Sequence, residues 1–171
     1  MLSRLRRTRT RRALAERLLS DIVARARAPV FYKEFRVSDT IDGRFDLTAL
    51  HAWMVLERLG ELGSRGLQQS LTDALFTSFD EGLRELGAGD IGIGRRMKKM
   101  ADAFYGRCHA YRAAGDRTEL SDAILRNVFR GDGERSREAR ALAEYVGTAR
   151  SSLSRIDPEN GALDFSPLPT V

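Results

Sequence analysis

Apolar side chains recur along this chain at spacings of three and four residues, which is the period of one face of an α-helix. Six stretches show this pattern, at residues 14–26, 47–62, 67–86, 95–114, 120–128 and 139–153. No stretch shows sustained alternation of apolar and polar residues, which is the pattern of a half-buried strand. The pattern therefore predicts an all-α protein of about six helices.

The stretch at residues 47–62 is apolar around most of its circumference. Its only polar strip is narrow and is formed by Glu57, Arg58 and Glu61 near the end. A helix that is apolar on nearly all sides is typical of the interior of a bundle, so we expect this one to be central. Asp46 lies directly before it and belongs to a residue type that often caps helices, so Asp46 is the predicted N-cap.

The remaining helices are amphipathic and are expected to surround the central one. In the stretch at 67–86, Asp80 precedes Arg84 by four residues, which favours an ion pair on the helix surface. Three of the four prolines, Pro158, Pro167 and Pro169, lie in the last 14 residues, where they disfavour a helix. We therefore expect one helical domain at residues 13–155, followed by an extended tail at 156–171.

Positive charge is concentrated at the start of the chain. The 171 residues include 29 Lys and Arg and 24 Asp and Glu, for a net charge of +5. Residues 1–12 hold six of the basic residues and no acid, so residues 13–171 carry 23 basic against 24 acidic side chains. Such an arm is often a solvated tail, but it could also tether the protein to ribosomal RNA or to an anionic membrane surface. The basic arm consists of Arg4, Arg6, Arg7, Arg9, Arg11 and Arg12.

The longest stretch without a charged residue, at 47–56, has ten residues, about half of the roughly 20 that a membrane-spanning helix needs. Charges also interrupt the segment after the basic arm, where an export signal would need an apolar run. The single cysteine, Cys108, fits a reducing compartment. We expect a cytoplasmic protein, with peripheral attachment to the inner membrane as an alternative. An Arg-rich start without acids also fits targeting to the mitochondrial matrix.

The sequence at 87–92, GAGDIG, has the glycine spacing of a dinucleotide-binding loop. That loop must follow a strand within a βαβ unit, whereas this one follows a predicted helix. We interpret the glycines as a helix C-cap and a tight connection, and we expect no nucleotide or other cofactor.

Cysteine and histidine are too few and too badly spaced for a metal site, since Cys108 and His109 are adjacent and the other histidine is His51. Cys108 falls on the apolar face of its helix and is predicted to be a core residue. His51 is predicted to be a half-buried residue with satisfied hydrogen bonds. An enzyme that uses Cys108 as a nucleophile with His51 as its base is the third-ranked function, since no third group is available to orient the pair.

Several short motifs resemble, in order and spacing, those of the ubiquinol-cytochrome c chaperone family, assembly factors of the cytochrome bc complex. They include DTIDGRFDL at 39–47, LERL at 56–59, GDIGIG at 89–94, MKKM at 97–100, AFYGR at 103–107 and RNV at 126–128. The resemblance extends over residues 14–165 and is to the compact bacterial form. It implies a helical, non-enzymatic chaperone that binds newly made cytochrome b, and that in mitochondria acts at the ribosomal exit tunnel with a small partner subunit.

A chaperone of apolar membrane segments needs a face with apolar and aromatic groups and with polar anchors at its rim. The candidate client-binding residues are the polar and aromatic members of the resembling motifs: Asp39, Thr40, Arg44, His51, Arg84, Asp90, Lys98, Tyr105, Arg107 and Asn127. Some of these have a simpler role open to them, because Asp39 and Asp90 could cap helices, and Arg44 and Arg84 could form internal ion pairs. The second-ranked function is a ribosome or RNA binder that acts through the basic arm alone.

Overall fold

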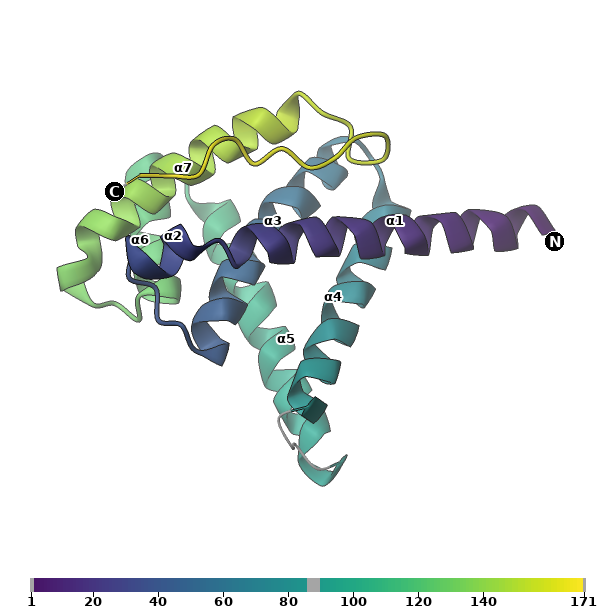
Figure 1. Cartoon of the computed structure of the whole chain (residues 1–171), viewed down its shortest axis with the longest axis horizontal. Coiled ribbons are helices and arrows are strands. Elements are labelled where there is room, and N and C mark those ends of the chain that lie inside the picture. Colours follow the sequence, from purple (N-terminus) through teal and green to yellow (C-terminus); the bar gives the residue numbers. More distant parts are fainter. Residues whose placement is uncertain (1, 86–89, 171) are drawn as a thin grey trace.

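The computed structural model describes the backbone of residues 2–85 and 90–170 and the side chains of residues 8–85 and 92–170. These residues form helices and no strand, which confirms the predicted all-α class (Figure 1). Six helices have 12 residues or more, and α2 and η1 are single turns. The elements are α1 (Leu2–Ala26), α2 (Pro29–Lys33), α3 (Ile41–Glu61), α4 (Arg65–Glu85), α5 (Asp90–Ala113), α6 (Arg117–Val128), η1 (Gly133–Arg135) and α7 (Ser136–Ser154).

Helix α3 is the central element, as its nearly continuous apolar sequence predicted. It packs against α1, α4, α5, α6 and α7. Its side chains are buried on all sides between Leu47 and Leu56, and Trp53 at its middle is one of the largest buried side chains of the described core. Burial of a large apolar side chain contributes about 2 kcal/mol, so α3 organises the bundle through its own composition.

The start of α3 differs from the prediction. The N-cap is Thr40, whose side-chain oxygen accepts a hydrogen bond from the backbone N–H of Gly43 at 3.2 Å. The helix therefore begins at Ile41, and Asp46 is not its cap but lies within the second turn, fully buried. The prediction of Asp46 as the cap was wrong. An aspartate before an apolar run can cap a helix, but it can also lie inside the helix when arginines from other helices pair with it, as they do here.

Gly43 lets the loop before α3 cross its first turn closely. A Cβ atom at this position would lie 1.9 Å from the carbonyl oxygen of Ser38, which is a backbone atom of the loop. We expect Gly43→Ala to lower the free energy of unfolding by about 2 kcal/mol, measured by urea denaturation, because the loop must move away from the helix. Gly106→Ala is the control, because a Cβ atom there meets nothing within 4 Å, and it should cause no loss. Equal stability of the two variants would contradict this reading.

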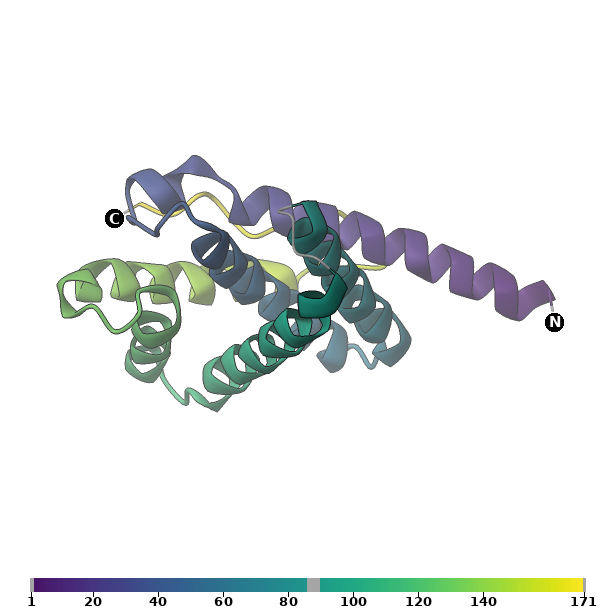
Figure 2. The ribbon, with the colours of Figure 1, turned by 90° about the horizontal axis from the view of Figure 1, so that it is seen from below.

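Helices α4 and α5 form a pair that projects from the body of the molecule (Figures 1 and 2). They meet at residues 86–89, which lie outside the described residues, as does the predicted glycine C-cap at this connection. At the other end of the pair, Phe104 of α5 is buried in the core. The projecting part of the pair has exposed positions on both helices, such as Arg84 and Arg95.

Helix α1 begins at Leu2, so the backbone of residues 2–12 is helical although the apolar pattern predicted a helix only from residue 14. Residues beyond 155 are not helical and run back along the bundle (Figure 1). Two arginines of α1 bind this tail through its backbone. Arg17 donates to the carbonyl oxygens of Pro158 and Gly161, both at 2.8 Å, and Arg25 donates to that of Ser166 at 2.7 Å. Phe165 of the tail is also buried in the core, where its ring lies 5.3 Å from that of His51, so backbone and side-chain contacts both hold the tail in place.

Candidate functional site

A groove of about 570 Å³ lies where the start of α3, the end of α4, the middle of α5 and the end of α6 meet. Apolar side chains form part of its lining, and basic side chains from two helices lie along it. Its acidic lining residue is Asp42. We call this feature the basic groove; its apolar members are Ile41, Phe45, Leu83, Met100 and Ala103, and its basic members are Arg96, Lys99, Arg107, Arg126 and Arg130.

A buried ion-pair cluster lies at the base of the basic groove. Asp46 has no exposed surface, and its Oδ1 lies 2.9 Å from Nε and 2.7 Å from Nη2 of Arg107. Its Oδ2 lies 2.8 Å from Nη2 of Arg130. Burial raises the pKa of Asp46, and the two guanidinium groups oppose that rise. The cluster joins three helices that are distant in sequence and fixes the geometry of the groove.

Arg130 reaches Asp46 from an unusual backbone conformation. Its φ is 58°, in the left-handed region that a non-glycine residue adopts only at an energetic cost of about 1 kcal/mol or more. Arg130 Nη1 donates to the carbonyl oxygen of Asn127 at 2.6 Å, and Asn127 Nδ2 donates to that of Ala123 at 2.8 Å. These contacts and the ion pair to Asp46 hold the arginine at the end of α6, where it lines the groove together with Asn127.

The second feature of this region is a chain of aromatic rings along α4 and α5, to which α3 contributes one ring. Phe45 lies 5.1 Å from Phe79 between ring centroids, and Phe79 lies 5.9 Å from Phe76. Phe76 lies 5.6 Å from Phe104 and 5.9 Å from Tyr105. We call these five residues the aromatic cluster; Tyr105 is 56% exposed, and Phe45, Phe76 and Phe79 are half-buried.

The structure brings Arg107 and Asn127 together in the basic groove and places Tyr105 in the aromatic cluster. Lys98 is exposed on α5. Asp90 is the first residue of α5, and its side chain lies outside the described residues.

The other predicted residues have mainly structural partners. Thr40 caps α3, and Asp39 forms an exposed ion pair with Arg44 at 2.7 Å. The hydrogen bond from Arg44 lowers the pKa of Asp39. Arg84 pairs with Asp80 at 2.8 Å, which confirms the predicted i, i+4 pair.

His51 lies in the core and has no exposed surface, so it cannot touch a client in this conformation. Its Nδ1 lies 2.7 Å from the carbonyl oxygen of Leu47, and its Nε2 lies 2.9 Å from the hydroxyl oxygen of Tyr145. Since the carbonyl only accepts, Nδ1 carries the proton and Nε2 accepts from Tyr145. The prediction of a structural, hydrogen-bonded histidine is confirmed, with burial more complete than expected.

Cys108 is buried in the core among apolar side chains, as predicted. Burial raises its pKa to about 12, which keeps the thiol protonated. The thiolate is the nucleophilic form of cysteine, so the geometry disfavours the enzyme hypothesis. No group of three His, Cys, Asp or Glu residues in the described part of the chain could hold a metal ion.

The basic arm is only partly described, because the side chains of Arg4, Arg6 and Arg7 lie outside the described residues. Arg9, Arg11 and Arg12 are exposed. Arg12 pairs with Glu16 at 2.9 Å, and the guanidinium of Arg11 lies close over Gly66 of α4. Arg12 thus has part of its charge compensated within α1. None of the helices in the described residues is long and apolar enough to cross a membrane.

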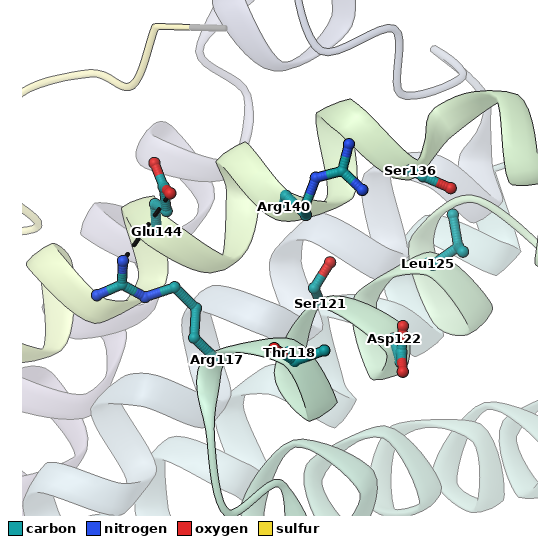
Figure 3. Close-up of a pocket in the computed structure, with 8 residues that line it drawn as sticks. All are labelled: Arg117, Thr118, Ser121, Asp122, Leu125, Ser136, Arg140 and Glu144. Carbon is teal, nitrogen blue, oxygen red and sulfur yellow. Dashed lines mark ion pairs between the residues drawn. The ribbon is translucent and has the colours of Figure 1, made fainter.

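A smaller pocket of about 210 Å³ lies between α6 and α7 (Figure 3). Arg117 and Glu144 form an ion pair of 3.9 Å at one end of it, and Leu125 is the apolar residue in its lining. None of the predicted site residues lines it. It lacks the apolar surface of the basic groove and is a weaker candidate for binding a client.

Sequence reasoning missed most of the basic groove. Ile41, Arg96, Lys99, Arg126 and Arg130 were not singled out because each is an ordinary residue of an exposed helix end or face. One local signal was present, since Arg130 precedes Gly131 at the end of a helix and marks a turn. The convergence of three helices on Asp46 has no signature at any single position of the sequence.

Comparison with known proteins gives consistent matches. A family model described as ubiquinol-cytochrome C chaperone matches residues 33–161. The chain is 24% identical over 150 residues to "Ubiquinol-cytochrome-c reductase complex assembly factor 1" of Xenopus laevis, a match that covers 85% of this chain and 75% of the frog protein. It is 25% identical over 151 residues to the mouse and human proteins of that name, and spans half the length of each. The crystal structure of the Cbp3 homolog from Brucella abortus matches with a TM-score of 0.81 and 36% identity, over 96% of this chain and 98% of that one.

Proposed function

Because the chain belongs to the ubiquinol-cytochrome c chaperone family, we propose that it assists assembly of the ubiquinol-cytochrome c reductase complex by holding newly made cytochrome b. The family match carries this proposal, since it covers residues 33–161 and thus the whole basic groove and aromatic cluster. Holding a client needs no covalent chemistry, which agrees with the buried, protonated state of Cys108.

The aromatic cluster is the surface that fits such a client best. A membrane protein outside the bilayer exposes apolar helices, and a chaperone must cover them with apolar surface of its own. Tyr105 of α5 and the half-buried phenylalanines of α4 offer this surface. Polar groups such as Lys98 lie beside it and can serve as rim contacts.

Deletion of the gene tests the function directly. We expect the assembled reductase complex to be lost, measured by native gel electrophoresis and by the spectrum of cytochrome b, while an unrelated membrane complex persists. Expression of the chain from a plasmid should restore the complex. A deletion strain with normal levels of the reductase complex would reject the proposed function.

Site-specific crosslinking tests the surface. A photoreactive amino acid in place of Tyr105 should capture newly made cytochrome b in cells, identified by mass spectrometry of the crosslinked band. The matched control carries the same residue in place of Arg137, which is exposed on α7 away from the cluster. Capture from neither position, or equal capture from both, would contradict the assignment of the aromatic cluster.

The ribosome-binding alternative rests on the basic arm, and the exposed Arg9 and Arg12 keep it testable. Removal of residues 1–12 should weaken cosedimentation with ribosomes at low salt if the arm is the tether, because contacts to phosphates depend on charge. The complex should still assemble in that strain if the aromatic cluster holds the client. Full cosedimentation of the truncated chain would reject the arm as the ribosome contact.

A further inference from the structure

Some cationic side chains of the basic groove take no part in the ion pairs of the described residues. Arg107 and Arg130 are engaged with Asp46, but Arg96, Lys99 and Arg126 have no carboxylate partner among the described residues. All three are exposed. Together with Arg107 and Arg130 they outnumber Asp42, the acidic residue of the lining, so the groove is net positive and attracts an anionic ligand.

The groove also offers apolar contacts beside these charges. Ile41 is 57% exposed at its edge, and Phe45, Met100 and Leu83 are half-buried in its lining. A ligand that suits the groove therefore carries negative charge next to an apolar portion. Anionic phospholipids have this chemistry, with a phosphate group attached to acyl chains.

The proposed client, cytochrome b, matches the basic groove less well than an anionic phospholipid does. Cytoplasmic loops of membrane proteins are enriched in Lys and Arg, so the basic groove repels the parts of cytochrome b that face the chaperone. The basic groove and the aromatic cluster share Phe45. On α5, however, Tyr105 lies nine residues after Arg96, which places the two on opposite sides of the helix at about 100° per residue. The two surfaces of α5 can therefore act at the same time.

We propose that the basic groove binds the headgroups of anionic phospholipids, so that the protein docks on an anionic membrane surface independently of its N-terminal arm. Arg96, Lys99 and Arg126 contact the phosphate groups, and Ile41 enters the interfacial layer beside them. The purpose we assign to this docking, which is to hold the client close to the bilayer into which it inserts, rests on the proposed function. The binding itself does not depend on it.

Sedimentation with lipid vesicles tests the proposal on the full chain. The probe is vesicles of phosphatidylcholine and phosphatidylglycerol in a three-to-one ratio, with pure phosphatidylcholine as reference. The variant Arg96→Gln/Lys99→Gln/Arg126→Gln should bind the anionic vesicles roughly 100-fold more weakly than the unchanged chain, since each basic residue near such a surface contributes about fivefold. The control Lys33→Gln/Arg65→Gln/Arg137→Gln removes the same charge at exposed positions elsewhere and should bind nearly as well as the unchanged chain. Circular dichroism should show both variants folded, because the replaced side chains are exposed.

The basic arm must be separated from the groove in the same assay. We expect the groove substitutions to weaken binding also in a chain in which all six arginines of the basic arm are replaced, Arg4→Gln/Arg6→Gln/Arg7→Gln/Arg9→Gln/Arg11→Gln/Arg12→Gln. Unchanged binding of the groove variant, equal weakening in the control variant, or a groove effect that vanishes with the arm would each overturn the proposal. Groove substitutions that abolish capture of an acidic protein in cells but leave vesicle binding intact would assign the groove to that protein instead. The vesicle assay contains no client, so a negative result there would not affect the proposed chaperone function. Conversely, a deletion strain with normal levels of the reductase complex would reject the chaperone function but would not affect the lipid-binding result.

Discussion

Replacing Arg107 by Met should lower the free energy of unfolding by about 3 kcal/mol. Arg107 makes two contacts of 2.9 and 2.7 Å to one oxygen of the fully buried Asp46, and its own side chain is only 14% exposed. Removal of the guanidinium leaves a buried carboxylate with Arg130 as its remaining cation. Urea denaturation followed by circular dichroism at pH 7 measures the loss.

A second substitution shows whether the loss comes from the uncompensated charge. In Asp46→Leu/Arg107→Met both charges are gone, and an apolar pair in a buried position is often as stable as the ion pair it replaces. We therefore expect the double variant to be more stable than Arg107→Met alone. Arg12→Gln, which breaks the exposed pair with Glu16, is the control and should cost no more than about 1 kcal/mol. If Arg107→Met costs as little as this control, Asp46 is not held by Arg107 in the way its geometry indicates.

Acidification from pH 7 to pH 5 should destabilise the fold by about 2 kcal/mol through His51 alone. Burial lowers the pKa of His51 to about 4, mainly by desolvation of the charged form, whereas an exposed histidine in the unfolded chain has a pKa near 6.5. Between these two values the unfolded state binds more protons than the folded one. Stability therefore rises with pH through this window and falls as the pH drops from 6.5 toward 4.

The hydrogen bonds of His51 explain why the folded state resists protonation. The Tyr145 hydroxyl accepts a hydrogen bond from Arg25 Nε at 2.9 Å and donates its hydrogen to His51 Nε2. A proton on Nε2 would face this hydroxyl hydrogen, and the hydrogen bond between them would be lost. The cation of Arg25 opposes a second positive charge nearby.

Variants at the two histidines separate this effect from the titration of carboxylates. In His51→Gln the loss of stability between pH 7 and pH 5 should shrink by about 2 kcal/mol. In His109→Gln, which replaces an exposed histidine, the loss should stay as in the unchanged chain. The same pH dependence in both variants would show that another group is responsible.

The projecting α4 and α5 pair combines two surfaces that differ in chemistry. One is aromatic and suits an apolar client, and the other is basic and suits an anionic membrane surface. Phe45 links them, since it lines the groove, lies under the guanidinium of Arg107 at 5.1 Å and belongs to the aromatic cluster, where its ring is tilted by 59° against that of Phe79. A change at Phe45 should therefore affect both surfaces, whereas changes at Tyr105 or Lys99 should affect one each.

The sequence by itself determined the helices, their central member and the family. Helical periodicity is a local property, so the apolar face of residues 47–62 was visible without any knowledge of its neighbours. The family motifs were equally visible, because short segments in fixed order carry their own pattern. Arg107 and Asn127 were identified in this way, although their shared position in one groove was not.

Only the tertiary structure decided the role of Asp46 and the existence of the basic groove. Asp46, Arg107 and Arg130 are separated by 61 and 23 residues, and a short acidic residue before an apolar run looks the same whether it caps a helix or is buried in one. What distinguishes the two cases is the electrostatic partner that packing supplies. Pairing across helices depends on how the whole bundle closes, and no local pattern of residues encodes it.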